Sequence, residues 1–324
     1  MILSRSPLRI SIGGGGTDLP SYYNFHDGFV IAAAINKYVY VTITKPFTKG
    51  IYLKYSNIEK TKNIQEIKHP IIKEVLKRQE FLSDQIEITT LADVPSGTGL
   101  GSSGSFTSAL IQALSHYNKK IISKKDIAEL ACHIEIDCLN EPAGKQDQYI
   151  STFGGIKCFT FKKNNEIIIE PLLISEKTIS DLENNLLLFF TGFERSASTI
   201  LSEQKENSDK KAIIDNLNYI KKLGYQIKNI LEGGDTKSFG NILNEHWQHK
   251  KKRSKKMTNS NIDELYNVGL ENGAIGGKVV GAGGGGFLLF YAKDKNKLSN
   301  KMQSLGVEEM KFKFDKEGTK IIDI

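Results

Sequence analysis

Apolar residues along the chain follow two periods, which together predict a mixture of strands and helices. Val39, Val41 and Ile43 alternate with polar neighbours, as do Ile86 and Ile88, and this period of two predicts strands with one buried face. A period of three to four residues predicts four amphipathic helices. Their apolar positions are Phe106, Ala109, Leu110, Ala113 and Leu114; Ile127, Leu130, Ala131, Ile134 and Cys138; Ile213, Leu217, Ile220, Ile227 and Leu231; and Phe239, Ile242, Leu243 and Trp247.

Short apolar runs complete this pattern and indicate where the chain divides. Residues 156–161, 186–190 and 287–291 have the length and composition of strands, and Met310, Phe312 and Phe314 alternate with lysines in a further one. Antiparallel strands with helices packed on one side, an α+β arrangement, fit this order better than strict βαβ alternation. The polar stretch 178–185 before the run at 186 predicts a boundary between domains 1–180 and 181–324.

Composition limits the class of protein. With 324 residues and 39% hydrophobic content, the chain can bury a sizeable core. Its apolar runs are too short to span a membrane, and Arg5 and Arg9 interrupt any signal-like segment, so we expect a cytoplasmic protein without a membrane partner. Cys132, Cys138 and Cys158 lack metal-ligand spacing and are interpreted as ordinary thiols.

The net charge of +7 is concentrated in one place. Six cationic residues lie between positions 250 and 256, and the rest of the chain is close to neutral. A nucleic-acid interface would usually spread along a face or include aromatic residues, so this pattern argues against a nucleic-acid partner. Two interpretations stay open: a solvated helix end, or a contact for an acidic small-molecule substrate.

The segment 95–105 is the strongest chemical signal. Its glycines and serines lead directly into the first predicted helix, so they lie at a helix N-terminus, where free amides and the helix dipole favour an anion. This predicts a phosphate-binding loop, although a serine-capped helix after a flexible loop has the same local pattern. It is not a Walker A loop, because no lysine precedes a terminal Ser or Thr.

The GxGxxG pattern of dinucleotide-binding proteins also occurs, at 99–104 and again at 281–286. The second copy leads into a predicted strand and not into a helix, and the first lies about ten residues after its nearest strand. A dinucleotide oxidoreductase is therefore a weak alternative.

Three glycine-rich segments, 6–18, 95–105 and 278–286, occur in an order and spacing that resembles the GHMP kinase superfamily, which includes galactokinase, homoserine kinase, mevalonate kinase and phosphomevalonate kinase. The resemblance covers nearly the whole chain. It implies a two-domain fold, with a ribosomal protein S5 domain 2-like N-terminal part and a ferredoxin-like C-terminal α/β sandwich. Segments 191–198 and 246–251 further resemble the D-glycero-D-manno-heptose 7-phosphate kinases of that superfamily.

The resemblance implies an ATP site that uses Mg²⁺. The residues at the matching phosphate-binding positions are Gly97, Gly99, Leu100, Gly101, Ser102, Ser103 and Gly104. Ser103 and Glu135 match the metal-binding pair, and oxygen ligands of this kind suit Mg²⁺. Taken alone, Glu135 could equally be a surface glutamate of a helix. Gly104 stands where many relatives have alanine, and we expect no loss of function from it.

The resemblance also implies the catalytic and sugar-binding residues. Asp147 matches the aspartate that faces the attacking hydroxyl, and Arg9 matches its arginine neighbour. A carboxylate there can accept the proton, and a guanidinium can offset charge in the transition state. Asp18, with Thr17 beside it, matches the position that binds sugar hydroxyls, although a Thr-Asp pair after four glycines could also cap a helix.

A sugar phosphate would need cationic donors, for which Arg195, Lys250 and Lys251 are the candidates. We expect Gly283 and Gly284 to lie nearest the transferred phosphate. The resemblance thus implies transfer from ATP to the anomeric hydroxyl of a heptose 7-phosphate, giving a 1,7-bisphosphate for capsule or lipopolysaccharide synthesis. The alternatives are a fucokinase-like or galactokinase-like sugar 1-kinase and a catalytically silent sugar-phosphate binder. The oligomeric state stays open, with a homodimer among the options.

Overall fold

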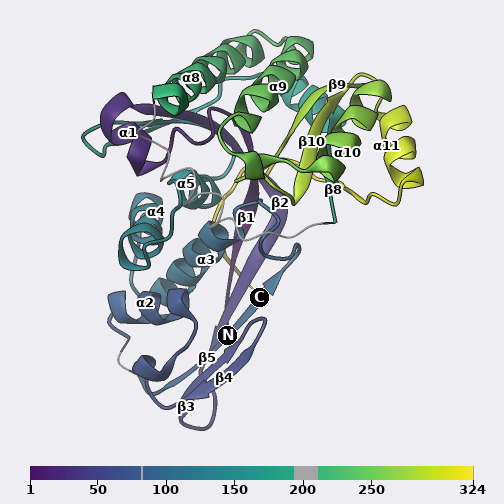
Figure 1. Cartoon of the computed structure of the whole chain (residues 1–324). Helices are drawn as coiled ribbons and strands as arrows, with labels where there is room; N and C mark the ends of the chain where they lie inside the picture. The colour runs from purple at the N-terminus through teal and green to yellow at the C-terminus, as the bar shows by residue number, and fades with distance from the viewer. Residues whose placement is uncertain (82, 193–210, 324) are drawn as a thin grey trace.

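The computed structural model describes residues 1–81, 83–192 and 211–323. These residues form an eight-stranded sheet and a four-stranded sheet, each flanked by helices (Figure 1). The α+β class predicted from the sequence is confirmed. Arg195 lies outside the described residues.

The larger sheet is built on two long strands, β1 (Ile2–Gly13) and β2 (Gly28–Thr44), which pair antiparallel. The strand order is β12-β1-β2-β5-β3-β4, with β6 and β7 attached through β2. All described pairs are antiparallel except β3 with β5. The predicted alternation in β2 is confirmed, because Val39, Val41 and Ile43 are buried. The remaining strands are β3 (Gly50–Lys54), β4 (Ile58–Thr61), β5 (Gln85–Ala92), β6 (Ile156–Phe161), β7 (Ile167–Pro171) and β12 (Lys320–Ile322).

Helices cover the larger sheet on the side that includes the glycine-rich segment 95–105 (Figure 1). Ser123 caps the second predicted helix, since its hydroxyl accepts from the Asp126 amide at 3.1 Å, but the α-helix ends at Cys132 and continues as a π-helical turn. The elements are α1 (Pro20–His26), η1 (Ile64–Glu66), α2 (Pro70–Arg78), α3 (Ser102–Tyr117), α4 (Lys124–Cys132), η2 (His133–Cys138) and α5 (Gln146–Phe153).

The smaller sheet has the order β11-β8-β10-β9 and is antiparallel throughout. Two helices, α8 and α9, pack between this sheet and the end of β1 and β2 (Figure 1). The elements are α6 (Glu176–Asn185), β8 (Leu186–Phe190), α8 (Lys211–Glu232), α9 (Thr236–Lys251), η3 (Lys255–Met257), α10 (Ser260–Glu271), β9 (Ala274–Val279), β10 (Phe287–Ala292), α11 (Lys295–Ser304) and β11 (Glu309–Met310).

The strand predicted over residues 310–314 is wrong beyond Met310. There the chain leaves the smaller sheet and runs along the middle of β2: the Asn36 amide donates to the Lys313 carbonyl, and the Asp315 amide donates to the Ala34 carbonyl, each at 2.9 Å. This course brings β12 to the edge of β1, so the end of the chain returns to the larger sheet. The predicted domain boundary falls within α6, and the two domain ranges stay a prediction.

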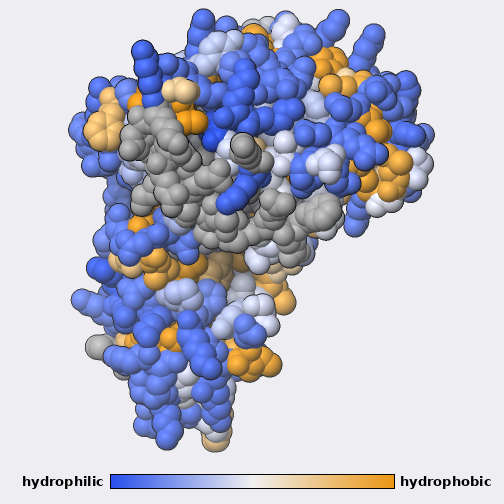
Figure 2. All heavy atoms as spheres, viewed as in Figure 1, coloured by the Kyte–Doolittle hydropathy of each residue, from blue (hydrophilic) through white to orange (hydrophobic). Residues whose placement is uncertain are grey.

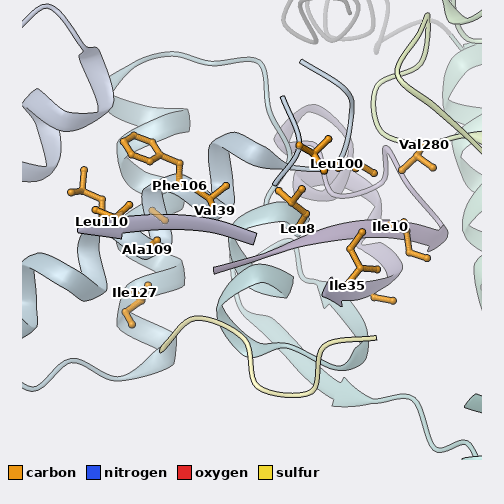
Figure 3. Packing of buried hydrophobic residues seen from close by; sticks show 14 of the residues in the cluster. Leu8, Ile10, Ile35, Val39, Leu100, Phe106, Ala109, Leu110, Ile127 and Val280 are labelled. Atoms are coloured by element: carbon orange, nitrogen blue, oxygen red, sulfur yellow. The ribbon is translucent and has the colours of Figure 1, made fainter. Parts of the chain in front are cut away.

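One hydrophobic cluster joins the glycine-rich segments to the sheet. Leu8 and Ile10 of β1, Leu100 of the second segment and Val280 of the third are fully buried and belong to the same cluster (Figure 3). The Arg9 amide also donates to the Leu100 carbonyl at 2.9 Å. Burial of these side chains therefore fixes the three segments relative to one another.

Replacing a core residue of α3 should destabilise this arrangement. Leu110 is fully buried in the cluster, and Leu110→Ala is expected to lower the free energy of unfolding by about 2–5 kcal/mol, because it removes packed atoms and leaves a cavity. Urea denaturation followed by circular dichroism measures this change. Ile121→Ala, at a fully exposed position, should stay within about 0.5 kcal/mol of wild type. Equal effects of the two changes would contradict this packing.

The outer surface is mostly hydrophilic on the face shown in Figure 2, where hydrophobic residues occur in small separate areas. Among the described residues, no helix combines the length and the apolar character needed to cross a bilayer.

Candidate active site

A cavity of about 700 Å³ lies where the three glycine-rich segments meet. Gly15 and Gly16 line it from the first segment, residues around Gly99 from the second, and Gly281 with Ala282 from the third. The structure thus brings together segments that are about 80 and 180 residues apart in the sequence.

The second segment has the geometry of an anion-binding helix N-terminus. Gly101 is the N-cap of α3 with φ of +78°, and Gly97 and Gly99 also have positive φ, a conformation that glycine adopts without strain. The hydroxyl of Ser105 donates to the Pro7 carbonyl at 2.7 Å, which ties the start of α3 to β1. The other predicted phosphate-binding residues divide by position: Gly97, Gly99, Gly101, Ser102 and Ser103 line the cavity, whereas Leu100 is buried in the core.

Gly104 has a packing role that the sequence alone did not indicate. A Cβ atom at this position would lie 2.9 Å from the Gln148 amide nitrogen of α5, closer than side-chain carbons pack. The glycine therefore lets α3 and α5 approach, and this approach sets the distance between the phosphate-binding segment and Asp147 at the start of α5.

Arg9 and Asp147 form a bidentate ion pair in this cavity. The Arg9 Nε and Nη2 atoms donate to Asp147 Oδ1 and Oδ2 at 2.7 and 2.8 Å, and Nη1 donates to the Gly99 carbonyl at 2.5 Å. Arg9 is buried, while the Asp147 side chain is 26% exposed and lines the cavity. Each carboxylate oxygen keeps a further lone pair, so Asp147 can still accept a proton from a bound hydroxyl.

Ser103 and Glu135, the predicted metal pair, are in contact. The Ser103 hydroxyl donates to Glu135 Oε2 at 2.6 Å, and the buried Glu135 Oε1 has no hydrogen-bond partner in the part of the chain that the structure describes. Burial is the main cause that raises the pKa of Glu135 to about 7. Glu135 lies in the π-helical turn η2, a local distortion of the kind often found at functional sites.

Asp18 faces the cavity, but Thr17 does not line it. The Asp18 carboxylate accepts from the Gly16 amide at 3.0 Å, and burial, followed by the charge of Asp147, raises its pKa. The Thr17 hydroxyl is fully buried and bonded to the Gly14 and Phe29 backbone. Thr17 therefore holds the first segment against β2, and Asp18 is the member of the pair placed for a ligand.

The third segment meets the cavity at a different point from the one expected. Gly283 and Gly284, predicted to lie nearest the transferred phosphate, pack against Met257, and the Gly284 amide donates to the Met257 carbonyl at 2.8 Å. Gly281 and Ala282 line the cavity instead. Gly281 has φ of +71°, and a Cβ there would lie 2.4 Å from the Gly99 carbonyl oxygen.

The structure separates the two predicted lysines of α9. Lys250 is buried, lines the cavity and donates from Nζ to the Val279 and Gly281 carbonyls at 2.9 and 2.5 Å. Lys251 pairs with Asp263 at 3.5 Å and does not line the cavity. Neighbouring residues on a helix point about 100° apart, so Lys250 and Lys251 cannot both face the cavity.

Four further residues line the cavity at the end where Lys250 lies, and the sequence patterns did not predict them: Ser11, His246, Arg253 and Lys278. Their spacing carried a signal, because positions 246, 250 and 253 follow a helical period, so His246 and Arg253 share the side of Lys250. Lys278 lies near the end of strand β9 and is the first residue of the third segment. In the sequence Arg253 is one of a run of charged residues, and no motif predicted a role for Lys278.

The opposite end of the cavity is largely apolar and was also missed. Phe106 of α3 lies there with Tyr55 and His69, and the ring centroids of His69 and Phe106 are 5.3 Å apart. Tyr55 follows β3 and His69 is the N-cap of α2, two places where the sequence patterns gave no chemical signal. Such a pocket beside a phosphate-binding helix N-terminus can hold an aromatic base.

The pKa of Lys278 makes stability depend on pH in a defined direction. Burial, then the charges of Arg253 and Arg9, lower it from 10.5 to about 7; His246 and Lys250 also face it. Between pH 7 and 10.5 the unfolded state binds more protons at this lysine, so its contribution to stability rises with pH. We expect the melting temperature of Lys278→Met, minus that of wild type, to be higher at pH 6 than at pH 9. Calorimetry on both proteins measures it, and a difference independent of pH would contradict the shift.

The cavity has the features of a phosphotransferase site: a glycine-rich helix N-terminus, a carboxylate beside it and an arginine that holds the carboxylate.

The family models for the GHMP kinases N terminal domain and the GHMP kinases C terminal match residues 67–155 and 226–308. The D-glycero-alpha-D-manno-heptose 7-phosphate kinase of Campylobacter jejuni is 32% identical over 98% of this chain and 98% of that protein. A galactokinase of Pyrococcus furiosus is 26% identical over 91% of this chain and 90% of its own.

A solved structure supports the same family assignment. A D-glycero-D-manno-heptose 1-phosphate kinase from Bacteroides thetaiotaomicron superposes with a TM-score of 0.84 at 26% identity, covering 100% of this chain and 99% of that one. The chain belongs to the GHMP kinase superfamily, with its two-domain fold, and is an ATP-dependent sugar kinase.

Proposed function

We propose that this kinase transfers the γ-phosphoryl group of ATP to the anomeric hydroxyl of D-glycero-α-D-manno-heptose 7-phosphate, giving the 1,7-bisphosphate. The observation that carries the proposal is the 32% identity over nearly the full length of both chains to a D-glycero-alpha-D-manno-heptose 7-phosphate kinase. The buried cations at one end of the cavity support an anionic substrate over a neutral sugar.

The residues of the cavity suit this transfer. The helix N-terminus at Ser102 and Ser103 offers amides and hydroxyls to the phosphates of the nucleotide. Asp147 orients the attacking hydroxyl and accepts its proton, while Arg9 holds the carboxylate in place and offsets charge in the transition state. Asp18 accepts hydrogen bonds from sugar hydroxyls.

Ser103 and Glu135 fit Mg²⁺. The partnerless Oε1 of Glu135 and the Ser103 hydroxyl beside Oε2 are oxygen ligands, and the described residues contain no cluster of three or more His, Cys, Asp or Glu for a tighter metal cage. Mg²⁺ is commonly held by one or two side chains, with water and substrate phosphates completing its shell. When bound, it would neutralise charge on the phosphates of ATP.

A second candidate differs in the position of the substrate's own phosphate. The Bacteroides relative is described as a heptose 1-phosphate kinase, whereas the Campylobacter relative is a 7-phosphate kinase. If the 1-phosphate is phosphorylated at its 7-hydroxyl, both substrates give the same bisphosphate, and the substrate rather than the product distinguishes the two activities. A fucokinase-like or galactokinase-like activity on an unphosphorylated sugar is the third option, and galactokinases are among the relatives.

The test is a steady-state comparison of substrates with coupled detection of ADP. Heptose 7-phosphate, heptose 1-phosphate, mannose 6-phosphate, fucose and galactose are offered separately with Mg·ATP. The proposal expects the highest kcat/KM with heptose 7-phosphate. A higher kcat/KM with the 1-phosphate or with a neutral sugar would replace it. We place the reaction in the cytoplasm, where ATP is available, and its product would supply nucleotide-activated heptose for capsule or lipopolysaccharide.

A further inference from the structure

Three cationic side chains converge at the end of the cavity formed by the first and third glycine-rich segments. Lys250, Arg253 and Lys278 are 6%, 5% and 2% exposed, and all three line the cavity. They come from α9, from the turn that follows it and from β9. We call Lys250, Arg253 and Lys278, with Ser11 and His246 beside them, the cationic cluster.

Backbone carbonyls hold these cations in place without neutralising them. Lys278 Nζ donates to the Ile12 carbonyl at 3.1 Å, Arg253 Nη1 donates to the Gly15 carbonyl at 3.1 Å, and Lys250 bonds the carbonyls of the third segment. In the part of the chain that the structure describes, none of the three forms an ion pair with a carboxylate. Burial lowers the pKa of Arg253 to about 10, and the negative charge of Asp18 offsets only part of this effect. The Asp147 carboxylate is already paired with Arg9.

Several polar atoms of the cluster have no partner. Among the described residues, nothing forms a hydrogen bond with the Ser11 hydroxyl, the Arg253 Nε atom or either ring nitrogen of His246. Ser11 and His246 are 5% and 1% exposed. A buried donor without a partner costs free energy, and such atoms in a native site commonly await a ligand. These side chains line the same part of the cavity as the three cations.

The charges oppose one another in the protein alone. Lys278 and Arg253 lower the pKa of Lys250, and Arg253 with Arg9 lowers that of Lys278, in each case after burial itself. Like charges held together away from water are unfavourable unless an anion joins them. The backbone contacts nevertheless hold the cations in position before any ligand arrives, which is how preorganised anion sites are built.

We propose that the cationic cluster is a phosphoryl-binding site, separate from the helix N-terminus at Ser102, that accepts the dianionic oxygens of a phosphate monoester. A phosphoryl group offers three strong acceptor oxygens in a tetrahedral arrangement and close to two negative charges. It can therefore accept from lysine, guanidinium and hydroxyl donors that approach from three chain segments. A carboxylate has a single charge and planar geometry, which suits one arginine better than this set.

Two sources supply this chemistry: the phosphate already carried by the sugar, and the phosphoryl group transferred from ATP. In the first case the cluster selects a phosphorylated sugar, which deepens the proposed function and rests on it. In the second it stabilises the group in transit. The binding of a phosphoryl oxyanion is common to both.

The first experiment measures binding without turnover. The melting temperature of the full chain is followed during titration with inorganic phosphate, with ionic strength held constant by chloride. Lys278→Met and Arg253→Met remove single charges from the cluster, and Lys252→Met, at an exposed neighbouring position, removes the same charge outside it. Circular dichroism at the starting temperature establishes that each variant is folded.

We expect a saturable rise in the melting temperature of wild type and of Lys252→Met. The phosphate concentration at half-saturation should increase roughly 10- to 100-fold in the two cluster variants, as expected for the loss of one charge-assisted hydrogen bond. Equal titrations for all four proteins, or no saturable rise in wild type, would overturn the proposal.

The second experiment distinguishes the two sources. The titration is repeated with saturating Mg²⁺ and a non-hydrolysable ATP analogue, and kinetics are measured for Lys278→Met. If the cluster holds the sugar's phosphate, inorganic phosphate still binds beside the analogue, and the variant raises the KM of the sugar phosphate but not that of ATP. If it holds the transferred group, the analogue displaces phosphate, and the variant lowers kcat with little change in that KM. Either result supports a phosphoryl site and assigns its source.

Failure of the inference differs from failure of the proposed function. Loss of phosphate binding in the cluster variants supports the site even if no heptose phosphate is turned over. Turnover of heptose 7-phosphate with unaltered phosphate binding in those variants supports the function and removes the cluster from it.

Discussion

Asp147→Asn should lower kcat by about 10²- to 10⁴-fold, the range expected when a general base is removed. The change takes away the proton acceptor and also one side of the bidentate pair with Arg9, because the amide nitrogen of asparagine cannot accept from a guanidinium. The KM for sugar and ATP should change much less. Steady-state kinetics with coupled ADP detection measures both parameters.

The control for this variant is Asp84→Asn, which removes an exposed carboxylate paired with Lys49 at 3.0 Å, away from the cavity. It should behave as wild type. If Asp147→Asn kept a kcat within threefold of wild type while remaining folded, Asp147 would be a structural partner of Arg9 and not the residue that handles the proton.

Glu135→Gln should weaken the binding of Mg²⁺ by a measurable amount. The glutamine keeps the size of the side chain but removes the negative charge, so the Mg²⁺ concentration for half-maximal rate should rise about 10- to 100-fold, as when metal-site partners are lost. A titration of initial rate with Mg²⁺ at fixed ATP gives this value.

Glu129→Gln is the matched control, because Glu129 lies on the preceding α4 helix, is half exposed and pairs with Lys125 at 3.7 Å. An unchanged Mg²⁺ titration for Glu135→Gln, together with a normal melting temperature, would remove Glu135 from the metal site. The contact with Ser103 would then serve only to fix the start of α3.

Local sequence patterns predicted much of the fold because they depend on neighbours along the chain. The glycines before Ser102 and the cap at Ser123 each describe a helix start, and the structure has helices at both places. The alternation at Met310, Phe312 and Phe314 predicted one strand, but beyond Met310 the segment contacts the middle of β2, which lies far away in the sequence.

In the site too, residues in local motifs were predicted, and residues placed by distant contacts were not. Arg9, Asp18, Ser103, Glu135 and Asp147 were predicted from motif positions, and the structure places them together around the cavity or in contact at its edge. Their assigned roles stay predictions.

Residues whose position depends on how one element packs against another were harder to predict from the sequence. Lys250 and Lys251 are equivalent as a charge run, and only the packing of α9 against β9 decides that Lys250 faces the cavity. Gly283 and Gly284 are likewise indistinguishable from Gly281 in sequence, and their contact with Met257 separates them. Lys278 begins the third glycine-rich segment, but the motif gave this side chain no role.

The most direct test of the account is ³¹P nuclear magnetic resonance of the reaction of this protein with D-glycero-α-D-manno-heptose 7-phosphate and Mg·ATP. The account predicts that one new sugar-phosphate resonance, coupled to the anomeric proton, grows in equal amount with ADP while the resonance of the 7-phosphate is retained. No new anomeric resonance with this substrate, together with turnover of the heptose 1-phosphate or of an unphosphorylated sugar, would contradict it.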